Sequence, residues 1–361
     1  MINKRLTAIA AAMMGVFSVA CAQEYSSYFD FEPLHYVCFK APQKVVLDGD
    51  IDGAEWAKVP WTEPFRDIQG SRRAVEPAYP TRAKMMWDNE YLYFAAEMVE
   101  PHIWATMTRR DDVIYYDNDI EIFIDPDADG HHYYEFEFNA FGTEWDLLLT
   151  QPYTRSGTFF TGWDLKGMRT AVKHYGTIND PSDTDQRWTI EVALPIHSLL
   201  ETIYFKRKIE DGEQWRINFS RVEWMAVEVI DGKYVKKKGK EGFGSEDNWV
   251  WSPTGVIDMH YPEFWGFLQF SNVIAGQGCD NFVVHPYDKT KRQLRHLAAR
   301  AEEFRRQKGS MPTSIDELRP QEIAVSGAIY YPCGNGYKLS LAGEDGVWYS
   351  LTSDGRIFPG K

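Results

Sequence analysis

Three glutamates at alternating positions are the side chains of this sequence best placed to do chemistry. Glu121 lies in one segment of apolar and polar alternation, and Glu135 and Glu137 lie in a second, both between Tyr115 and Asp146. Successive side chains of a strand point to opposite faces, so the three carboxylates would share one face of a β-hairpin. Such a face could hold a cation, accept hydrogen bonds from sugar hydroxyls, or supply the acid and nucleophile of a glycosidase.

The same face also permits a purely structural interpretation. Clustered carboxylates repel one another unless they are neutralised, and Lys84, Arg216 and Arg221 could neutralise them from neighbouring strands. Glu191 would join the cluster if its strand is adjacent. An internal ion-pair network and a sugar- or cation-binding face therefore both stay open. The opposite, apolar face of the hairpin is expected to enter the core and contains Ile120, Ile122, Ile124, Tyr134, Phe136 and Phe138.

The turn of this hairpin is rich in aspartate. Asp125, Asp127 and Asp129, followed by Gly130, match the opening of an EF-hand loop, which places oxygen ligands at alternate positions before a glycine. The twelfth position is Phe136 instead of the bidentate glutamate of that loop. The turn is therefore a candidate structural calcium site, with a simple Asp/Gly turn as the alternative.

The elements that would position these residues are short strands. Alternating segments with turn residues between them recur from Cys38 to Ser271, and a long amphipathic helix is almost absent from this region. This pattern predicts an all-β fold, an antiparallel β-sandwich assigned here to residues 41–273. The other predicted strands lie at Arg82 to Asp88, Tyr91 to Val99, Trp188 to Pro195 and Trp215 to Arg221.

A second, smaller unit follows a linker over residues 274–287. Lys291 to Gln307 carries apolar residues at helical spacing and ends before Gly309. Short strands are predicted after it, at Tyr337 to Leu341, Val347 to Leu351 and Arg356 to Phe358. Residues 288–361 are therefore predicted to form a small α+β domain.

The first residues resemble an export signal, here residues 1–22. Lys4 and Arg5 precede an apolar run and small residues. Cleavage before Gln23 and a lipoprotein cleavage with a lipid anchor at Cys21 are both open. Residues 23–40 would be a leader on the surface of the sandwich. We expect an exported protein of the periplasm or cell surface, with a possible lipid anchor in the outer membrane.

Charge and cysteine content narrow the class of protein further. The net charge of −14 argues against a nucleic-acid partner, which would require clustered Lys and Arg. Cys38, Cys279 and Cys333 remain in an oxidising compartment, where Cys38 and Cys279 could form a disulfide or all three could be thiols.

Six segments in this order resemble the family 9 carbohydrate-binding modules: LDGDIDGAEW, MMWDNEYLYFAAEMVE, DNDIEIFIDPDADG with YYEFEFNAFGTEWD, RWTIEVALP, WRINFSRVEW and HYPEFWGFLQF. The resemblance runs through about residues 41–273. It implies a β-sandwich that binds sugars, with calcium in structural positions, usually as part of or beside polysaccharide-degrading enzymes.

The resemblance also implies site residues, with departures from the family pattern. The family clamps one sugar between two tryptophans; Tyr115 stands at the first position and Met259, beside His260, at the second. Glu121 retains a polar sugar contact, whereas Glu137 stands where the family has an arginine. Trp163, in the Gly/Thr-rich loop FFTGWD, is a further candidate to stack on a sugar.

These observations favour non-catalytic carbohydrate binding, in the capture or breakdown of an oligo- or polysaccharide. One alternative is a glycoside hydrolase that uses carboxylates of the Glu121, Glu135 and Glu137 face. Another is a structural or partner-binding module of a cell-envelope complex. Glycan-degrading enzymes would be the expected protein partners.

Overall fold

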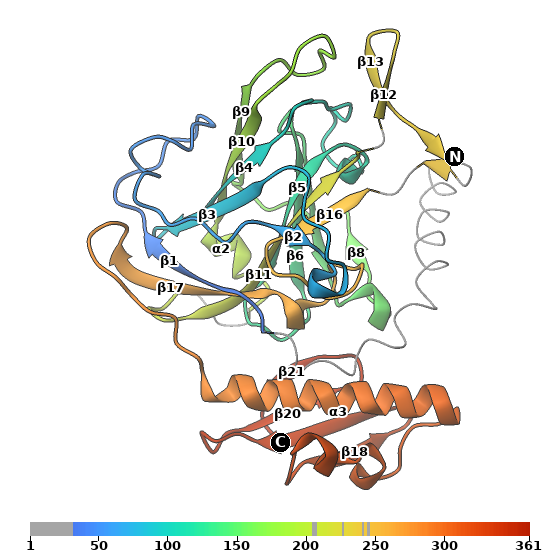
Figure 1. Cartoon of the computed structure of the whole chain (residues 1–361). Coiled ribbons are helices and arrows are strands. Elements are labelled where there is room, and N and C mark those ends of the chain that lie inside the picture. The colour runs from blue at the N-terminus through green and yellow to red at the C-terminus, as the bar shows by residue number, and fades with distance from the viewer. Residues whose placement is uncertain (1–31, 204–207, 226, 240–241, 244–245) are drawn as a thin grey trace. The chain divides into compact units, whose positions relative to one another are not determined.

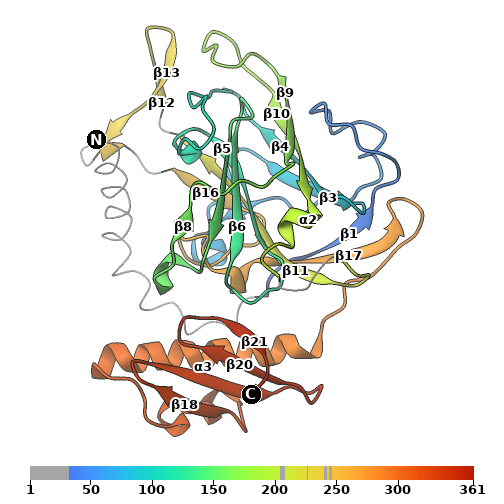
Figure 2. The same cartoon turned by 180° about the vertical axis from the view of Figure 1, so that it is seen from behind.

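The structure, a computed structural model, describes residues 32–361 except 204–207, 226, 240–241 and 244–245. The chain divides into a sandwich unit, Pro33–Val283, and a C-terminal unit that covers Val284–Lys361 among the described residues. Each unit is considered by itself. Figure 1 and Figure 2 show the strands of the sandwich from two sides.

Thirteen strands of the sandwich unit belong to one continuous sheet, in the order β8-β7-β6-β5-β11-β17-β1-β3-β4-β10-β9, with β16 on β11 and β2 on β16. Their bounds are β1 (His35–Lys40), β2 (Arg66–Asp67), β3 (Thr81–Trp87), β4 (Tyr91–Val99), β5 (Asp119–Asp125), β6 (Tyr133–Asn139), β7 (Glu144–Leu149), β8 (Phe159–Phe160), β9 (Arg169–Tyr175), β10 (Arg187–Pro195), β11 (Gln214–Glu223), β16 (Asp247–Val250) and β17 (Gly266–Ile274).

The sheet encloses one large apolar core, which confirms the predicted all-β sandwich. Ile122 from β5, Phe94 from β4 and Trp188 from β10 belong to the same buried cluster, although β5 lies far from the adjacent strands β4 and β10 along the sheet. The rings of Phe94 and Phe219 lie 4.7 Å apart across this core. The two halves of the sheet therefore pack face to face, as aligned sandwiches do.

Strand β1 departs from the predicted arrangement. Residues 23–40 were expected to form a surface leader, but β1 pairs in parallel with β17 and with β3 and joins the two halves of the sheet. The reason is local: Tyr36 and Cys38 alternate with less buried neighbours and put their side chains into the core. The compact unit accordingly starts at Pro33 instead of residue 41, and the sandwich is not antiparallel throughout.

Smaller elements connect the strands. The β12–β13 hairpin extends away from the rest of the sandwich unit in both views (Figure 1 and Figure 2). The small strands are β12 (Val227–Ile230), β13 (Lys233–Lys236), β14 (Lys238–Gly239) and β15 (Gly242–Phe243); the helical turns are η2 (Gly70–Arg72), η3 (Ile114–Tyr116), η4 (Tyr153–Arg155), α2 (Ile196–Leu199) and η5 (Pro262–Phe264).

The C-terminal unit is a helix on a four-stranded sheet of order β18-β19-β20-β21, as the predicted α+β class requires. The helix starts earlier than its apolar pattern indicates, with Pro286 at its first position, and ends before Gly309 at a φ of 73°. Leu294 and Leu297 pack in the same cluster as Leu339. The elements are α3 (Pro286–Lys308), η6 (Ile315–Leu318), η7 (Pro320–Ile323), β18 (Ile329–Cys333), β19 (Gly336–Ala342), β20 (Trp348–Thr352) and β21 (Ile357–Pro359).

Three cysteines of the described residues are thiols. Cys38 is buried, whereas Cys279 and Cys333 are exposed, so the structure does not form the Cys38–Cys279 disulfide. The export signal and Cys21 lie outside the described residues. Within the described residues, no helix is both long enough and apolar enough to cross a bilayer.

Candidate functional site

The β5–β6 hairpin has the two faces that the sequence predicts. Ile120, Ile122 and Ile124 point into the large core. On the other face Glu121 and Glu137 are direct cross-strand partners. Glu135 pairs with Phe123 in the same ladder, so the three predicted glutamates lie on one face.

This face is more buried than a solvated acidic surface would be. The exposed fraction is 6% for Glu121, 5% for Glu135, 2% for Glu137 and zero for Asp119, which precedes Glu121 by two positions on the same strand. The amide of Tyr115 donates to Glu137 Oε2 at 3.0 Å. Asp119 Oδ2 and Glu135 Oε2 have no hydrogen-bond partner among the described residues.

Burial also changes the acidity of these carboxyl groups. Burial, with a smaller contribution from the charge of Glu246, raises the pKa of Glu121 to about 8. Burial followed by repulsion from Glu121 raises the pKa values of Asp119, Glu135 and Glu137 well above their ordinary values. Ionised carboxylates so placed are costly without a neutralising or hydrogen-bonding ligand.

Aromatic side chains continue the acidic face along β5 and β6 and onto the neighbouring strand β7. Phe123, Tyr133 and Trp145 belong to one buried cluster on this side of the sheet, together with Met259 and Trp265. Trp145 pairs with Glu137 in the β6–β7 ladder, and its Nε1 has no hydrogen-bond partner among the described residues. The face therefore holds an unpartnered donor as well as unpartnered acceptors.

Met259 and His260 lie against the aromatic part of this face. Met259 is buried and accepts a hydrogen bond from Trp265 Nε1 at 2.7 Å through its carbonyl oxygen. His260 Nδ1 lies 2.9 Å from the hydroxyl of Tyr133. Burial lowers the pKa of His260 to about 3, so the imidazole is neutral at physiological pH.

Two half-buried tyrosines lie beside the carboxylates. Tyr115, in η3, and Tyr153, in η4, both pack against the aromatic cluster of this face. Burial and then the charges of Glu135 and Glu137 raise the pKa of Tyr153. Sequence reasoning missed Tyr153, because a single ring in a loop carries no signal of which face the loop covers.

Trp163 does not join this group. Its ring stacks on Tyr134 at a centroid distance of 4.9 Å, and Tyr134 points to the opposite face of the hairpin. The loop that carries Trp163 therefore contacts the core side of the sheet, and the prediction of Trp163 as part of the same site is wrong.

The expected neutralising residues contact other groups, although Arg216 is on the same face as Glu121. Arg221 is buried on the core side, with ion pairs to Glu100 at 2.8 Å and Glu223 at 2.7 Å. Arg216 donates to the carbonyl oxygen of Trp265. The ion-pair network predicted for the acidic face is thus built around other carboxylates.

Glu191 and Lys84 belong to the other half of the sheet. Glu191 accepts hydrogen bonds from Trp56 Nε1 and from the amides of Asp48 and Gly49. Lys84 donates to the carbonyl oxygen of Ile51. Glu191 therefore does not enlarge the cluster formed around Glu121.

The aspartate turn brings its three carboxylates together. One oxygen from each of Asp125, Asp127 and Asp129 lies within 4.8 Å of the others. The amide of Gly130 donates to Asp125 Oδ2 at 2.9 Å, while Asp125 Oδ1 is buried without a hydrogen-bond partner among the described residues. The donor set fits a calcium ion, which prefers oxygen ligands.

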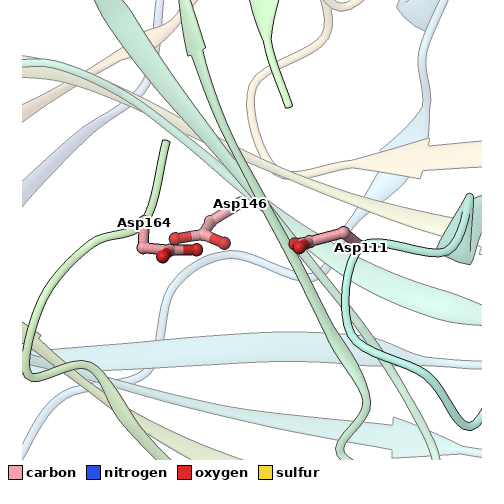
Figure 3. A group of neighbouring side chains, drawn as sticks. All are labelled: Asp111, Asp146 and Asp164. Carbon is pink, nitrogen blue, oxygen red and sulfur yellow. The ribbon is translucent and has the colours of Figure 1, made fainter. Parts of the chain in front are cut away.

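A third acidic group consists of Asp111, Asp146 and Asp164, whose carboxylates converge (Figure 3). The guanidinium of Arg110 pairs with Asp146 at 2.5 Å and with Asp164 at 3.1 Å, and it also pairs with Glu144. This group already contains its own cation, so we interpret it as an ion-pair network.

Residues 47–211 match the family model described as carbohydrate family 9 binding domain-like. The resemblance to the family 9 modules is thereby confirmed over this range, which includes β5, β6, Tyr115 and Tyr153.

Comparisons with individual proteins found the following similarities. Exoglucanase XynX from Acetivibrio thermocellus is 31% identical over 102 residues, which make up 28% of this chain and only 8% of the exoglucanase. Two structures of a family 9 module from Caldicellulosiruptor kristjanssonii are similar to this chain. The complex with cellotriose has 16% identity and a TM-score of 0.41 over 69% of this chain and 98% of the module. The complex with glucose has 15% identity and a TM-score of 0.40 over 68% and 98%.

Proposed function

We propose that the sandwich binds carbohydrate without catalysis, at the face formed by Glu121, Glu135 and Glu137. The observation that carries this proposal is that these carboxylates and the two half-buried tyrosines, Tyr115 and Tyr153, meet on one side of the sheet. They do so within the segment that matches the family of carbohydrate-binding modules.

The chemistry of the face suits a sugar. An aromatic ring packs against the apolar C–H face of a pyranose, and a few polar groups then select its hydroxyls. Glu135 Oε2 would accept a hydroxyl hydrogen and Trp145 Nε1 would donate to a sugar oxygen, because both lack partners among the described residues. Tyr115 and Tyr153 would take the places of the two aromatic rings of a clamp.

Calorimetric titration with cellotriose and glucose tests this function. Tyr153→Ala and Tyr115→Ala should each weaken binding at least about tenfold, since a lost hot-spot ring typically costs 2 kcal/mol or more. Trp163→Ala is the matched control and should leave the affinity within about twofold, because its ring packs on the other face. Saturable binding that neither tyrosine variant weakens, or no binding across a broader glycan array, would reject the proposed site.

The hydrolase alternative has one observation in its favour. Oxygens of Glu121 and Glu137 lie within 4.8 Å of each other, near the separation used by retaining glycosidases. The same titrated samples should release no reducing sugar during long incubation. Release that disappears in Glu121→Gln would instead establish catalysis.

We also propose calcium as a structural ion at Asp125, Asp127 and Asp129. A ligand present at 100 times its dissociation constant stabilises the folded state by about 2.7 kcal/mol, so millimolar calcium should raise the melting temperature by several degrees. Asp127→Ala/Asp129→Ala should remove most of this shift, whereas Asp164→Ala, in the group neutralised by Arg110, should retain it. If the melting temperature is the same in calcium as in chelator, the result counts against the calcium site.

We propose that the chain is exported and that its ligand is a glycan. We further propose that it is held by a lipid anchor or acts together with glycan-degrading enzymes. Mass spectrometry of the mature protein decides between cleavage before Gln23 and lipidation of Cys21. An N-terminus at Met1 in the mature protein would overturn export by a cleaved signal.

A further inference from the structure

A second candidate ligand site lies within the acidic face. Asp119, Glu121 and Glu137 each place one carboxylate oxygen within 4.8 Å of the other two. Glu121 and Glu137 face each other across the β5–β6 ladder, and Asp119 is the next residue on the same face of β5. Three rigid strand positions thus hold three oxygen ligands around one point.

Other buried carboxylates of this protein are more fully hydrogen-bonded. Asp117, two residues before Asp119, accepts hydrogen bonds from the amides of Thr106 and Met107, from the Thr106 hydroxyl and from Asn139 Nδ2, all at 2.9 Å or less. Asp119 accepts only a long bond, 3.4 Å, from the amide of Val222. Its other oxygen, Oδ2, is fully buried and has no partner among the described residues.

The group also has no ion-pair partner within the described part of the chain. None of the ion pairs there involves Asp119, Glu121 or Glu137. The basic side chain of Lys236 approaches this region, but its Nζ lies over the ring of Trp224, 3.6 Å from the centroid. A buried cluster of this kind requires protons or a bound cation to persist.

We propose that Asp119, Glu121 and Glu137 bind a hard divalent cation, such as Ca²⁺ or Mn²⁺. The ligand set is all oxygen, which suits these ions and disfavours zinc or copper. Oxygens within 4.8 Å of one another match a central ion about 2.3 to 2.6 Å from each. The ion would occupy the floor of the proposed sugar site, where sugar hydroxyls could complete its coordination.

The test measures the metal directly. In an Asp127→Ala/Asp129→Ala background, which removes two of the three carboxylates of the aspartate turn, titration of the full chain with Mn²⁺ should show one bound ion by electron paramagnetic resonance. Asp119→Asn and Glu137→Gln, which preserve side-chain shape, should each weaken that binding at least about tenfold, as loss of a coordinating charge does. Glu201→Gln removes one exposed carboxylate and should leave it unchanged. Circular dichroism checks that each variant is folded.

The outcomes distinguish the cation site from the proposed sugar-binding function. Only the suggestion that sugar hydroxyls complete the coordination of the ion rests on that function. Absence of Mn²⁺ and Ca²⁺ binding in folded Asp127→Ala/Asp129→Ala protein would overturn the cation site while leaving sugar binding to be measured independently. Metal binding that Asp119→Asn does not weaken would also overturn it. If metal binds as expected but no sugar does, the cation site stands and the proposed function fails.

Discussion

Replacing Arg221 with methionine should lower the free energy of unfolding of the sandwich by about 3 to 5 kcal/mol, the cost of removing one partner of a buried ion pair. The Arg221 side chain is only 1% exposed and pairs with Glu100 and Glu223, which are 4% and 3% exposed. It also donates to Thr81 Oγ1 at 2.9 Å and to the carbonyl oxygen of Val99 at 3.0 Å. Methionine retains the volume but leaves two buried carboxylates without their cation.

Urea unfolding followed by tryptophan fluorescence measures this effect, since every tryptophan except Trp348 lies in the sandwich unit. Arg109→Met is the matched control. Arg109 pairs with Asp112 at 2.6 Å, but its side chain is 82% exposed, so the loss should stay below about 1 kcal/mol. Equal effects of the two substitutions would show that the Arg221 network does not stabilise the fold.

Replacing Glu191 with alanine should cost about 3 kcal/mol, because an unsatisfied buried donor costs about 1 to 3 kcal/mol and Glu191 serves several. Its carboxylate accepts from Trp56 Nε1 at 2.6 Å and from the amides of Asp48 and Gly49 at 2.8 and 2.7 Å. The turn at Gly49 has a φ of 82° and packs closely on β9, so it cannot easily move to find new acceptors.

The same unfolding assay tests this prediction. Glu201→Ala, at an exposed position, should change stability by less than about 0.5 kcal/mol. Glu191→Gln should fall between the two, because one amide oxygen cannot accept from donors on both sides of the former carboxylate. A loss below about 1 kcal/mol for Glu191→Ala would mean that water replaces the carboxylate.

These two substitutions bear on function because they define how the sandwich stabilises a buried carboxylate. Glu223 has a guanidinium partner, and Glu191 has three donors. Asp119 has one long hydrogen bond, and Glu135 has an oxygen without any partner among the described residues. Buried carboxylates of the same sheet thus differ in their hydrogen-bond and ion-pair partners, and this difference is the physical reason to expect a ligand at the acidic face.

The sequence predicted the hairpin well because its information is local. Period-two alternation assigns each residue of β5 and β6 to a face without reference to the rest of the chain. Glu121, Glu135 and Glu137 were therefore placed together correctly, and Ile122 and Phe136 were placed in the core. The turn between the two strands could be predicted from its residues for the same reason.

Contacts between distant segments were less predictable. The acidic face had three plausible basic partners, Lys84, Arg216 and Arg221. Which of them forms an ion pair depends on which strands are adjacent and on the face of the sheet to which each side chain points. Arg221 is at a core-facing position of β11, so its guanidinium meets Glu100 and Glu223. Alternation on one strand does not reveal the face to which a charge on another strand belongs.

By itself, the sequence determined the all-β class, the hairpin and the face on which its carboxylates lie, because backbone geometry ties side-chain direction to sequence position. Only the tertiary structure decided that β1 joins the sheet, that Trp163 faces the core side and that Tyr153 packs against the same aromatic cluster as Tyr115. Those placements depend on the paths of loops and on long-range packing, which leave no periodic signal in the chain.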